Sequence, residues 1–291
     1  MAQERKREGG LESRYPIQLL LTQATERLRG HVDNPRLDAE LLLAHLLGKD
    51  RVFLYTHPDF EVPPEVEQRF WAWIERRREG YPVAYLIGYR EFYGRPFLVR
   101  EGVLIPRPET EHLVERALAK IPPESAPTII DVGCGSGAIA ITLALERPQS
   151  FVVATDLSQR ALSIARENRL RLDAGNVALL RGRWLEPFRS GIADMVVSNP
   201  PYVAAGDPYL RGEIRFEPPE ALVSGPTGLE AYEALVPQAF RVLKRGGWLL
   251  LEHGFDQAEA VAEILRRAGF REIRTFRDLQ NLPRVSEGRV G

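Results

Sequence analysis

Apolar and polar residues repeat at helical spacing through about the first 80 positions of the chain. The pattern runs from Ile17 to about Leu47 and is interrupted at Asp33-Asn34-Pro35, where one helix should end and another begin. Residues 51–55 are expected to form a short helix or turn, and Pro63-Pro64 opens a longer helix through Arg78. These elements predict a small all-α domain over residues 1–85, with a frayed polar stretch at residues 1–14.

Three consecutive basic residues, Arg76-Arg77-Arg78, end the last predicted helix of this domain. Cations near a helix C-terminus interact favourably with the helix dipole. We interpret the run as a solvated helix end, with contact to an acidic partner as the alternative.

The pattern changes character at residue 86. Tyr89 to Tyr93 and Phe97 to Val99 flank Gly94-Arg95-Pro96, which is typical of a β-hairpin. We expect this hairpin, within residues 86–105, to link two domains. A helix should then start in Ile105-Pro106-Arg107-Pro108-Glu109-Thr110-Glu111, with Pro108 near its first turn and the glutamates at the positive end of its dipole.

Short apolar runs alternate with helical segments from residue 128 onward. Such alternation predicts an α/β domain over residues 106–291, with a mostly parallel seven-stranded sheet covered on both faces. No helix separates the last two strands, so the final strand should be antiparallel. Strands are predicted at 128–132, 151–155, 176–180, 192–197, 247–252, 270–276 and 283–289, and helices at 137–147, 158–173, 229–244 and 256–268.

Composition narrows the class of protein. The 291 residues carry a formal net charge of -1, which argues against a dedicated nucleic-acid binder. Cys134 is the only cysteine, and the 5 histidines lack metal-ligand spacing, so neither a disulfide framework nor a metal site is expected. No secretory signal and no apolar run of membrane-spanning length is found. We therefore expect a soluble, reduced, cytoplasmic protein.

A glycine-rich turn follows the first strand of the α/β segment. Asp131 precedes Gly133-Cys134-Gly135-Ser136-Gly137, and glycine permits a tight turn and close approach of a ligand to backbone N–H groups. Dinucleotide-binding turns look similar, but their spacing differs, and a carboxylate at Asp131 suits an amino-acid ammonium better than a pyrophosphate. The turn therefore favours S-adenosylmethionine over NAD, with Cys134 itself as a small packing residue.

Two further side chains stand at predicted strand ends. Asp156 lies about twenty residues after the glycine turn, where a carboxylate can accept hydrogen bonds from ribose hydroxyls. The alternative is a helix N-cap, for which Ser158 competes. Trp184, in Arg181-Gly182-Arg183-Trp184, can cover an adenine face or, alternatively, pack under a loop.

The sequence Asn199-Pro200-Pro201-Tyr202 ends the strand predicted at 192–197. Two prolines cannot continue a sheet, because neither has an N–H for the ladder. The chain must leave in a stiff turn that presents the Asn199 amide, carbonyl oxygens and an aromatic ring at the carboxyl edge of the sheet. Such a cluster suits a substrate –NH₂ group, although a turn that merely ends a strand is the alternative.

Together these features indicate a class I, S-adenosylmethionine-dependent methyltransferase of Rossmann-like fold with an amino-group acceptor. Nearly the whole chain resembles the HemK/PrmC family, the protein-glutamine N5-methyltransferases of peptide chain release factors. Asn-Pro-Pro-Tyr also occurs in adenine-N6 and guanine-N2 methyltransferases. The helical N-terminal domain and the Ile105–Glu111 run are the features that make the resemblance specific to the HemK/PrmC family. It rests on Arg36-Leu37-Asp38-Ala39-Glu40, Arg76–Gly80, Tyr89-Arg90-Glu91-Phe92, Ile105–Glu111, Asn199–Tyr202, Arg215-Phe216-Glu217-Pro218 and Leu251-Glu252-His253-Gly254.

The resemblance implies roles for particular residues. The Gly133–Gly137 turn, Asp156, Trp184 and Asn199 would bind the cofactor, and Asn199-Pro200-Pro201-Tyr202 would hold the glutamine of a Gly-Gly-Gln motif. Residues 1–85 would help to recognise the release factor, with the enzyme acting as a monomer. One departure concerns Arg183, because many family members carry an acidic residue there that could accept the adenine amino group.

The expected reaction is an in-line displacement by the glutamine amide nitrogen on the methyl carbon of the cofactor. The Asn199 side-chain oxygen and the Pro200 carbonyl would accept the two N–H hydrogens, and Tyr202 would pack on the amide. Two alternatives remain at this stage. One is a nucleic-acid methyltransferase that flips a base into the pocket, and the other is a cofactor-binding fold retained for protein association.

Overall fold

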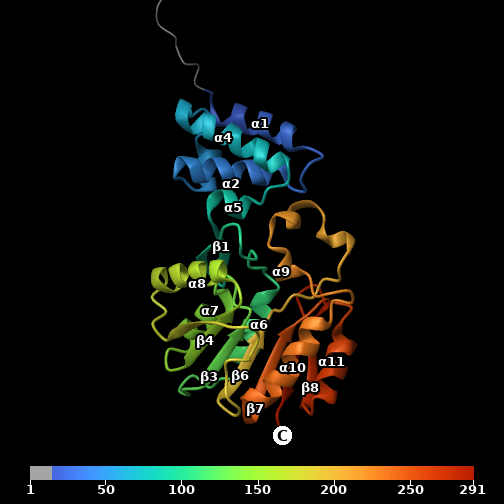
Figure 1. The fold of residues 1–291 in the computed structure, drawn as a ribbon. Coiled ribbons are helices and arrows are strands. Elements are labelled where there is room, and N and C mark those ends of the chain that lie inside the picture. Colours follow the sequence, from blue (N-terminus) through green and yellow to red (C-terminus); the bar gives the residue numbers. More distant parts are fainter. Residues whose placement is uncertain (1–14) are drawn as a thin grey trace, which may run out of the picture. The chain divides into compact units, whose positions relative to one another are not determined.

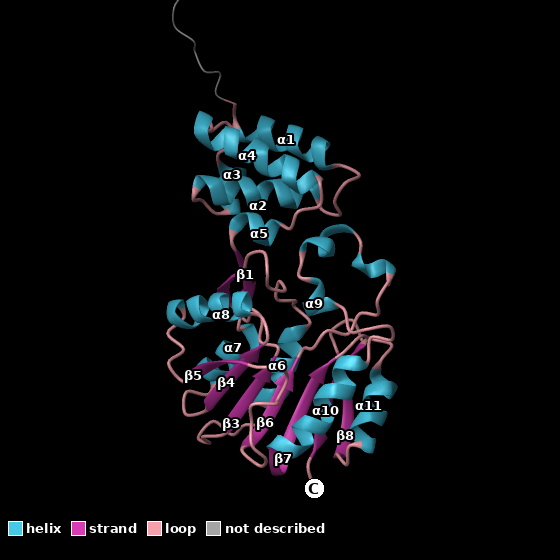
Figure 2. Ribbon diagram, viewed as in Figure 1, coloured by secondary structure: helices cyan, strands magenta, loops and turns pink. Residues whose placement is uncertain are grey.

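The computed structural model describes residues 15–291, so the expected frayed end and the missing secretory signal lie outside the described residues. The chain divides into two compact units, Met1–Ile87 and Gly88–Gly291, which can be followed by colour in Figure 1. Strands occur in the second unit, and the described part of the first unit is built from helices (Figure 2). No helix in residues 15–291 is long and apolar enough to cross a membrane.

The helices of the first unit pack through apolar faces. Leu20, Leu43, Phe70 and Ile74 are fully buried where α1, α2 and α4 meet, because apolar residues at helical spacing lie on one face of each helix. The helices are α1 (Ile17–Leu28), α2 (Pro35–Leu47), α3 (Arg51–Thr56), α4 (Pro64–Arg78) and α5 (Val83–Ile87).

The arginine run at the end of α4 is not a uniformly solvated helix end. Arg77 is buried, and its Nε donates to Asp38 Oδ2 at 2.7 Å while its Nη1 donates to the Tyr81 carbonyl at 3.2 Å. The sequence-based interpretation is therefore wrong for this arginine, because the α2 carboxylate that pairs with it is distant in sequence. A buried pair of this kind ties α2 to the end of α4.

A β-hairpin opens the second unit, formed by β1 (Tyr89–Phe92) and β2 (Arg95–Leu98). Its two turn residues, Tyr93 and Gly94, have φ of 51° and 70°, the conformation of turns that match the twist of a hairpin. Phe92 and Phe97 are fully buried in the core of this unit. The hairpin is thereby anchored to the sheet domain by its own aromatic side chains.

The main sheet of the second unit has seven strands in the order β5-β4-β3-β6-β7-β9-β8. Neighbouring strands are parallel from β5 to β7, and β9 is antiparallel to both of its neighbours, which confirms the predicted final strand. The strands are β3 (Thr128–Val132), β4 (Phe151–Asp156), β5 (Val177–Arg181), β6 (Ala193–Ser198), β7 (Leu243–Glu252), β8 (Arg271–Arg277) and β9 (Pro283–Arg289).

Both faces of the sheet are buried, and alternate strand residues serve opposite faces. Ile129 and Val197 join one apolar cluster with α6, α7 and α8, whereas Ile130 and Val196 join another with α10 and α11. Helices accordingly cover both faces (Figure 2). They are α6 (Thr110–Leu118), α7 (Ala138–Glu146), α8 (Gln159–Arg171), α10 (Glu230–Val242) and α11 (Ala258–Arg267).

The predicted elements of this unit are confirmed to within a few residues, and Pro108 lies near the first turn of α6, which begins at Thr110. Two differences remain. β7 begins at Leu243, directly after α10, rather than at 247. The connection between β6 and α10 contains short elements that no sequence pattern indicated, namely the 3-10 segments η1 (Pro208–Leu210) and η2 (Gly212–Phe216) and the short helix α9 (Pro219–Leu222).

Candidate active site

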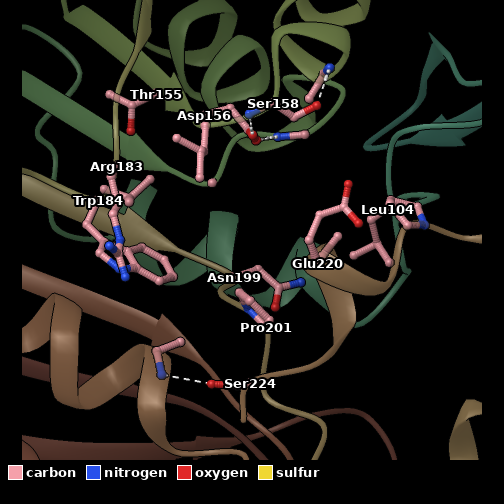
Figure 3. Close-up of a pocket in the computed structure, with 18 of the residues that line it drawn as sticks. Leu104, Thr155, Asp156, Ser158, Arg183, Trp184, Asn199, Pro201, Glu220 and Ser224 are labelled. Carbon is pink, nitrogen blue, oxygen red and sulfur yellow. Dashed lines mark hydrogen bonds between the residues drawn. The ribbon is translucent and has the colours of Figure 1, made fainter. Parts of the chain in front are cut away.

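A pocket of about 670 Å³ lies at the carboxyl ends of the parallel strands β3, β4 and β6. Its wall includes Gly133, Asp156, Trp184 and Asn199, and Figure 3 shows the last three around the same space. This is the edge at which open parallel sheets bind ligands, and the volume lies within the range of about 300–1,000 Å³ that is usual for ligand pockets.

The N–H groups of the first three residues of the glycine turn are hydrogen-bonded within the protein. The Gly133 and Cys134 N–H groups both donate to the Thr155 carbonyl, at 2.8 and 2.9 Å, and the Gly135 N–H donates to Asp156 Oδ2 at 2.9 Å. The end of the neighbouring strand β4 therefore already binds three N–H groups of the turn, and contact of the turn's N–H groups with a ligand stays a prediction. What remains for a ligand is space beside the turn, since a Cβ added at Gly133 or Gly135 would have no protein atom within 4 Å.

The other residues of the turn lie behind the pocket wall. Cys134 is buried in the core, and burial raises the pKa of its thiol well above the usual value. The Ser136 carbonyl accepts a hydrogen bond from Asn168 Nδ2 at 2.9 Å. Gly137 has φ of 84°, and an added Cβ would lie 2.9 Å from the Ile141 side chain. These residues shape the turn, and their contact with a cofactor stays a prediction.

Asp131 is completely buried at the end of β3, immediately before Val132, which lines the pocket. Its Oδ2 accepts the Ala140 N–H at 3.0 Å, in the first turn of α7. Its Oδ1 has no hydrogen-bond partner within the described residues. Burial raises the pKa of the carboxyl to about 7, against which the Ala140 N–H acts to lower it. An approaching cation would satisfy the free oxygen and favour the ionised form.

Asp156 faces the pocket and also holds the turn. Its Oδ2 accepts the Gly135 N–H and its Oδ1 accepts the Ser158 N–H at 2.8 Å, as the dashed lines in Figure 3 show. Ser158 caps α8 by accepting the Ala161 N–H at 3.2 Å, so the helix cap that competed with the ribose role belongs to Ser158. Burial raises the pKa of Asp156, partly offset by these N–H groups. Its carboxylate retains lone pairs for hydroxyl donors.

Trp184 lines the same pocket as Asp156 (Figure 3). Its φ of 50° places a bulky side chain in the left-handed region, which is uncommon and follows from the surrounding structure. The ring packs against the apolar cluster under α10 and also lines the pocket. Both sequence-based interpretations of this tryptophan therefore have a structural basis, and its contact with adenine stays a prediction.

Asn199 follows β6 and lines the pocket with its side chain half-buried. Its Nδ2 donates to the Thr110 Oγ1 at 3.2 Å. Thr110 is the first residue of α6, at the end of the Ile105–Glu111 run. Within the described residues, the Asn199 Oδ1 makes no hydrogen bond and is available as an acceptor for a substrate N–H.

A second, smaller pocket of about 330 Å³ adjoins the first, and the two share Asn199. Tyr202 lines the second pocket, and burial raises the pKa of its phenol, so the ring stays neutral. Pro201 lines the first pocket, whereas Pro200 is buried and lines neither. The predicted roles of Pro200 and Pro201 remain predictions. Asn199 lines both pockets, as do the apolar residues Leu104 and Ala221.

Sequence reasoning missed several residues in the two pockets and beside them. Glu217 accepts the Ile105 N–H at 2.8 Å and pairs with Arg107, so that it joins two segments far apart in sequence. Glu220 adds a carboxylate to the first pocket (Figure 3), and Glu252 adds one to the second. The motifs that carry the family resemblance contain Glu217 and Glu252, but nothing local indicates that Glu217 joins two distant segments or that Glu252 lines a pocket.

The first pocket fits S-adenosylmethionine by the chemistry of its wall. The Asp156 carboxylate suits ribose hydroxyls, and the Trp184 ring suits a flat base. Asp131 is fully buried next to Val132 of the wall, and its free oxygen suits an ammonium. The glycine turn leaves open space for the cofactor beside Gly133 and Gly135. A seven-stranded sheet of this topology with such a pocket defines the protein as an S-adenosylmethionine-dependent methyltransferase of class I.

Comparison with known proteins identifies the family within this class of methyltransferases. Residues 19–88 match the family model of the PrmC N-terminal domain, and residues 110–215 match that of the methyltransferase small domain. The release factor glutamine methyltransferase of Xylella fastidiosa (strain Temecula1) is 46% identical over 271 residues, which covers 93% of this chain and 96% of that protein. Those of Pseudomonas aeruginosa and Escherichia coli (strain K12) are 47% and 42% identical, over 88% of this chain and 94% and 93% of theirs. The chain belongs to the family of release factor glutamine methyltransferases.

Solved structures agree with the fold of the second unit. A methyltransferase from Pyrococcus furiosus aligns with a TM-score of 0.51 and 18% identity over 75% of this chain and 97% of that one. A ribosomal protein L11 methylase from Lactobacillus delbrueckii subsp. bulgaricus aligns with a TM-score of 0.50 and 19% identity, over 70% and 91% of the two chains. These similarities show the Rossmann-like methyltransferase fold.

Replacing Trp184 with alanine should raise the Kd for S-adenosylmethionine about tenfold, because stacking of an aromatic ring on a base contributes about 1–3 kcal/mol. Trp184→Phe keeps an aromatic ring in the same pocket wall, so its Kd for S-adenosylmethionine should stay within about threefold of the wild-type value. Calorimetric titration of the cofactor measures both values. An unchanged Kd for Trp184→Ala, together with a lower Tm, would leave only the packing role.

Proposed function

We propose that this enzyme transfers a methyl group from S-adenosylmethionine to the side-chain amide nitrogen (N5) of the glutamine in the Gly-Gly-Gln motif of a class-1 peptide chain release factor. The observation that carries the proposal is the position of Asn199, which lines both a large and a small pocket and whose Nδ2 is held by Thr110, so that its Oδ1 is left to accept a substrate N–H. The large pocket would take the cofactor and the small one the glutamine side chain. The relatives that share most of the chain are named release factor glutamine methyltransferases.

The bound cofactor supplies a methyl group on a positively charged sulfur. Asp131 and Asp156 would hold its ammonium and ribose hydroxyls, and Trp184 would cover its adenine. With Arg183 in place of an acidic residue, a backbone carbonyl of this loop would take the adenine amino group.

Asn199 would orient the acceptor. An amide nitrogen is a poor nucleophile, because its lone pair is delocalised into the carbonyl. The Asn199 Oδ1 and, as predicted from sequence, the Pro200 carbonyl would accept its two N–H hydrogens at roughly 2.7–3.2 Å. This fixes the nitrogen toward the first pocket and favours the positive charge that develops on it. The neutral Tyr202 ring would pack beside the amide.

We assign recognition of the release factor to the helical unit together with the surface around the second pocket. We further propose that the enzyme acts as a monomer in the cytoplasm and does not bind nucleic acid directly. The formal net charge of -1 supports the last point. Light scattering coupled to size exclusion tests the monomer.

Transfer of a labelled methyl group tests the proposed function. The acceptors are a class-1 release factor, the same factor with its Gly-Gly-Gln glutamine changed to alanine, and ribosomal RNA. Label is expected on the unaltered factor alone. Label on RNA, or equal label on both forms of the factor, would overturn the substrate assignment.

A further inference from the structure

Glu252 adds a carboxylate to the wall of the second pocket, which Asn199 also lines. It is the last residue of β7, and Asn199 directly follows β6. The two strands are parallel neighbours in which Ser198 pairs with Leu251. The next residues along the strands, Asn199 and Glu252, therefore occupy neighbouring positions at the carboxyl edge of the sheet. An acceptor nitrogen held by Asn199 thus lies in a pocket that also contains a carboxylate.

The Glu252 carboxyl is buried and incompletely hydrogen-bonded. Only 1% of the surface of this residue is exposed, and its Oε2 has no hydrogen-bond partner in the part of the chain that the structure describes. Burial of a carboxylate oxygen without a donor is costly, because water no longer solvates it. An oxygen of this kind in a pocket wall suits a ligand that brings its own hydrogen, as the –NH₂ group of an amide does.

Methylation of an amide nitrogen requires the loss of one proton, because –NH₂ becomes –NH–CH₃. The Asn199 Oδ1 and the Pro200 carbonyl would orient the hydrogens, but amide oxygens are too weakly basic to keep a proton near neutral pH. Two carboxylates line the second pocket within the described residues, those of Glu109 and Glu252. Glu109 is partly exposed, whereas Glu252 is buried and has the unpartnered oxygen. Glu252 is therefore the better placed proton acceptor.

We propose that Glu252 is a catalytic residue that receives the proton lost by the glutamine amide nitrogen. The nitrogen lone pair forms the bond to the methyl carbon while the C–S bond breaks, and the electron pair of that bond goes to the sulfur. As the nitrogen becomes tetrahedral, one N–H bond breaks, its electron pair stays on the nitrogen, and the proton passes to the Glu252 carboxylate. The neutral acid releases the proton to water after the product leaves. This inference rests on the proposed function, since the acceptor is an amide.

Charged and titratable groups from several elements surround the Glu252 carboxyl. They are Arg107, Glu109, Tyr202, Tyr209 and Arg284 in the wall of the same pocket, and Tyr232 of α10, whose hydroxyl donates to the Glu252 main-chain carbonyl. Burial raises the pKa of the Glu252 carboxyl to about 7, and Glu109 also acts to raise it. The Thr110 side chain and the two arginines act to lower this pKa. A base of this pKa is ionised in part at neutral pH and holds a proton well when it receives one.

Glu252→Gln keeps the size of the side chain but removes its ability to take up the proton. We expect the single-turnover rate of methyl transfer to the release factor at pH 8 to fall about 10²-fold, which lies within the range of about 10²–10⁴ for a general base. The wild-type rate should decline below about pH 7 as Glu252 becomes protonated, whereas the rate of Glu252→Gln should not respond to pH in this range. The Kd for S-adenosylmethionine, titrated by calorimetry without acceptor, should change less than about threefold, because Glu252 lines the second pocket and not the first.

Glu109→Gln supplies a second readout that leaves Glu252 itself unaltered. Loss of a neighbouring negative charge lowers the pKa of the Glu252 carboxyl, so the midpoint of the pH–rate profile should move to lower pH. A residue that only supports the fold would not produce this shift. The same measurement decides the question if Glu252→Gln does not fold.

The inference would be overturned by a Glu252→Gln rate within about threefold of the wild-type rate at pH 8, far from the loss expected for a general base. A Glu252→Gln variant that keeps the wild-type pH profile, or a midpoint that does not move in Glu109→Gln, would overturn it as well. A wild type that methylates no release factor would instead overturn the proposed function, so the two failures are distinguishable.

Discussion

Asn199→Ala is expected to lower the turnover number about 10²–10³-fold, the cost of losing one group that stabilises developing charge at a reacting centre. The cofactor Kd should change less than about threefold, because the walls around Asp156 and Trp184 are left intact. The physical reason is that Asn199 lines both pockets and its Nδ2 is held by Thr110, which leaves its Oδ1 to accept the substrate N–H. Single-turnover methyl transfer and calorimetric titration of the cofactor measure the two quantities.

Trp184→Ala is the matched control for this substitution, since it should weaken cofactor binding and leave saturated turnover within a fewfold of the wild type. Asn199→Ala is thus expected to affect mainly the turnover number and Trp184→Ala mainly the cofactor Kd, although both residues line the same pocket. If Asn199→Ala lost cofactor affinity and turnover to the same extent, Asn199 would be a cofactor ligand and not the acceptor of the substrate N–H.

Asp131→Asn is expected to raise the Kd for S-adenosylmethionine about 10–100-fold at pH 8, because a neutral amide replaces the carboxylate that would face the ammonium. The same change should stabilise the protein without cofactor. The pKa of Asp131 is about 7 in the folded chain, above its ordinary value of 3.8, so ionisation opposes folding. Removing that cost should raise the free energy of unfolding by about 1–3 kcal/mol at pH 8.

The raised pKa of Asp131 also sets the direction in which stability without cofactor changes with pH. Since the folded pKa is the higher one, the wild type without cofactor loses stability as the pH rises from about 4 to about 7. The advantage of Asp131→Asn should therefore shrink as the pH is lowered over this range. Cofactor affinity of the wild type should weaken below pH 7, whereas that of the variant should not respond to this group. Thermal unfolding with and without cofactor at several pH values measures both effects, and an unstable variant without cofactor would contradict the reasoning.

The alternation of strands and helices could be read from the sequence because it is local. A buried strand between two helical layers needs a continuous apolar run, and β3 and β6 show such runs. The absence of a helix between β8 and β9 likewise required an antiparallel neighbour. The segment between β6 and α10 has no such period, because its short turns are held by contacts such as that of Glu217 with Ile105, from a distant part of the chain.

The candidate site likewise has features that local sequence patterns predict and features that only the tertiary structure determines. The sequence by itself determined which side chains stand at the carboxyl ends of strands, namely Asp131, Asp156 and Asn199, because strand ends follow from local patterns. Only the tertiary structure decided what each of them meets. It bonded the N–H groups of Gly133, Cys134 and Gly135 to Thr155 and Asp156, and it placed the Thr110 hydroxyl against the Asn199 Nδ2. The reason is physical: periodicity reports the face on which a side chain lies, whereas hydrogen-bond partners depend on which distant strand or helix packs beside it.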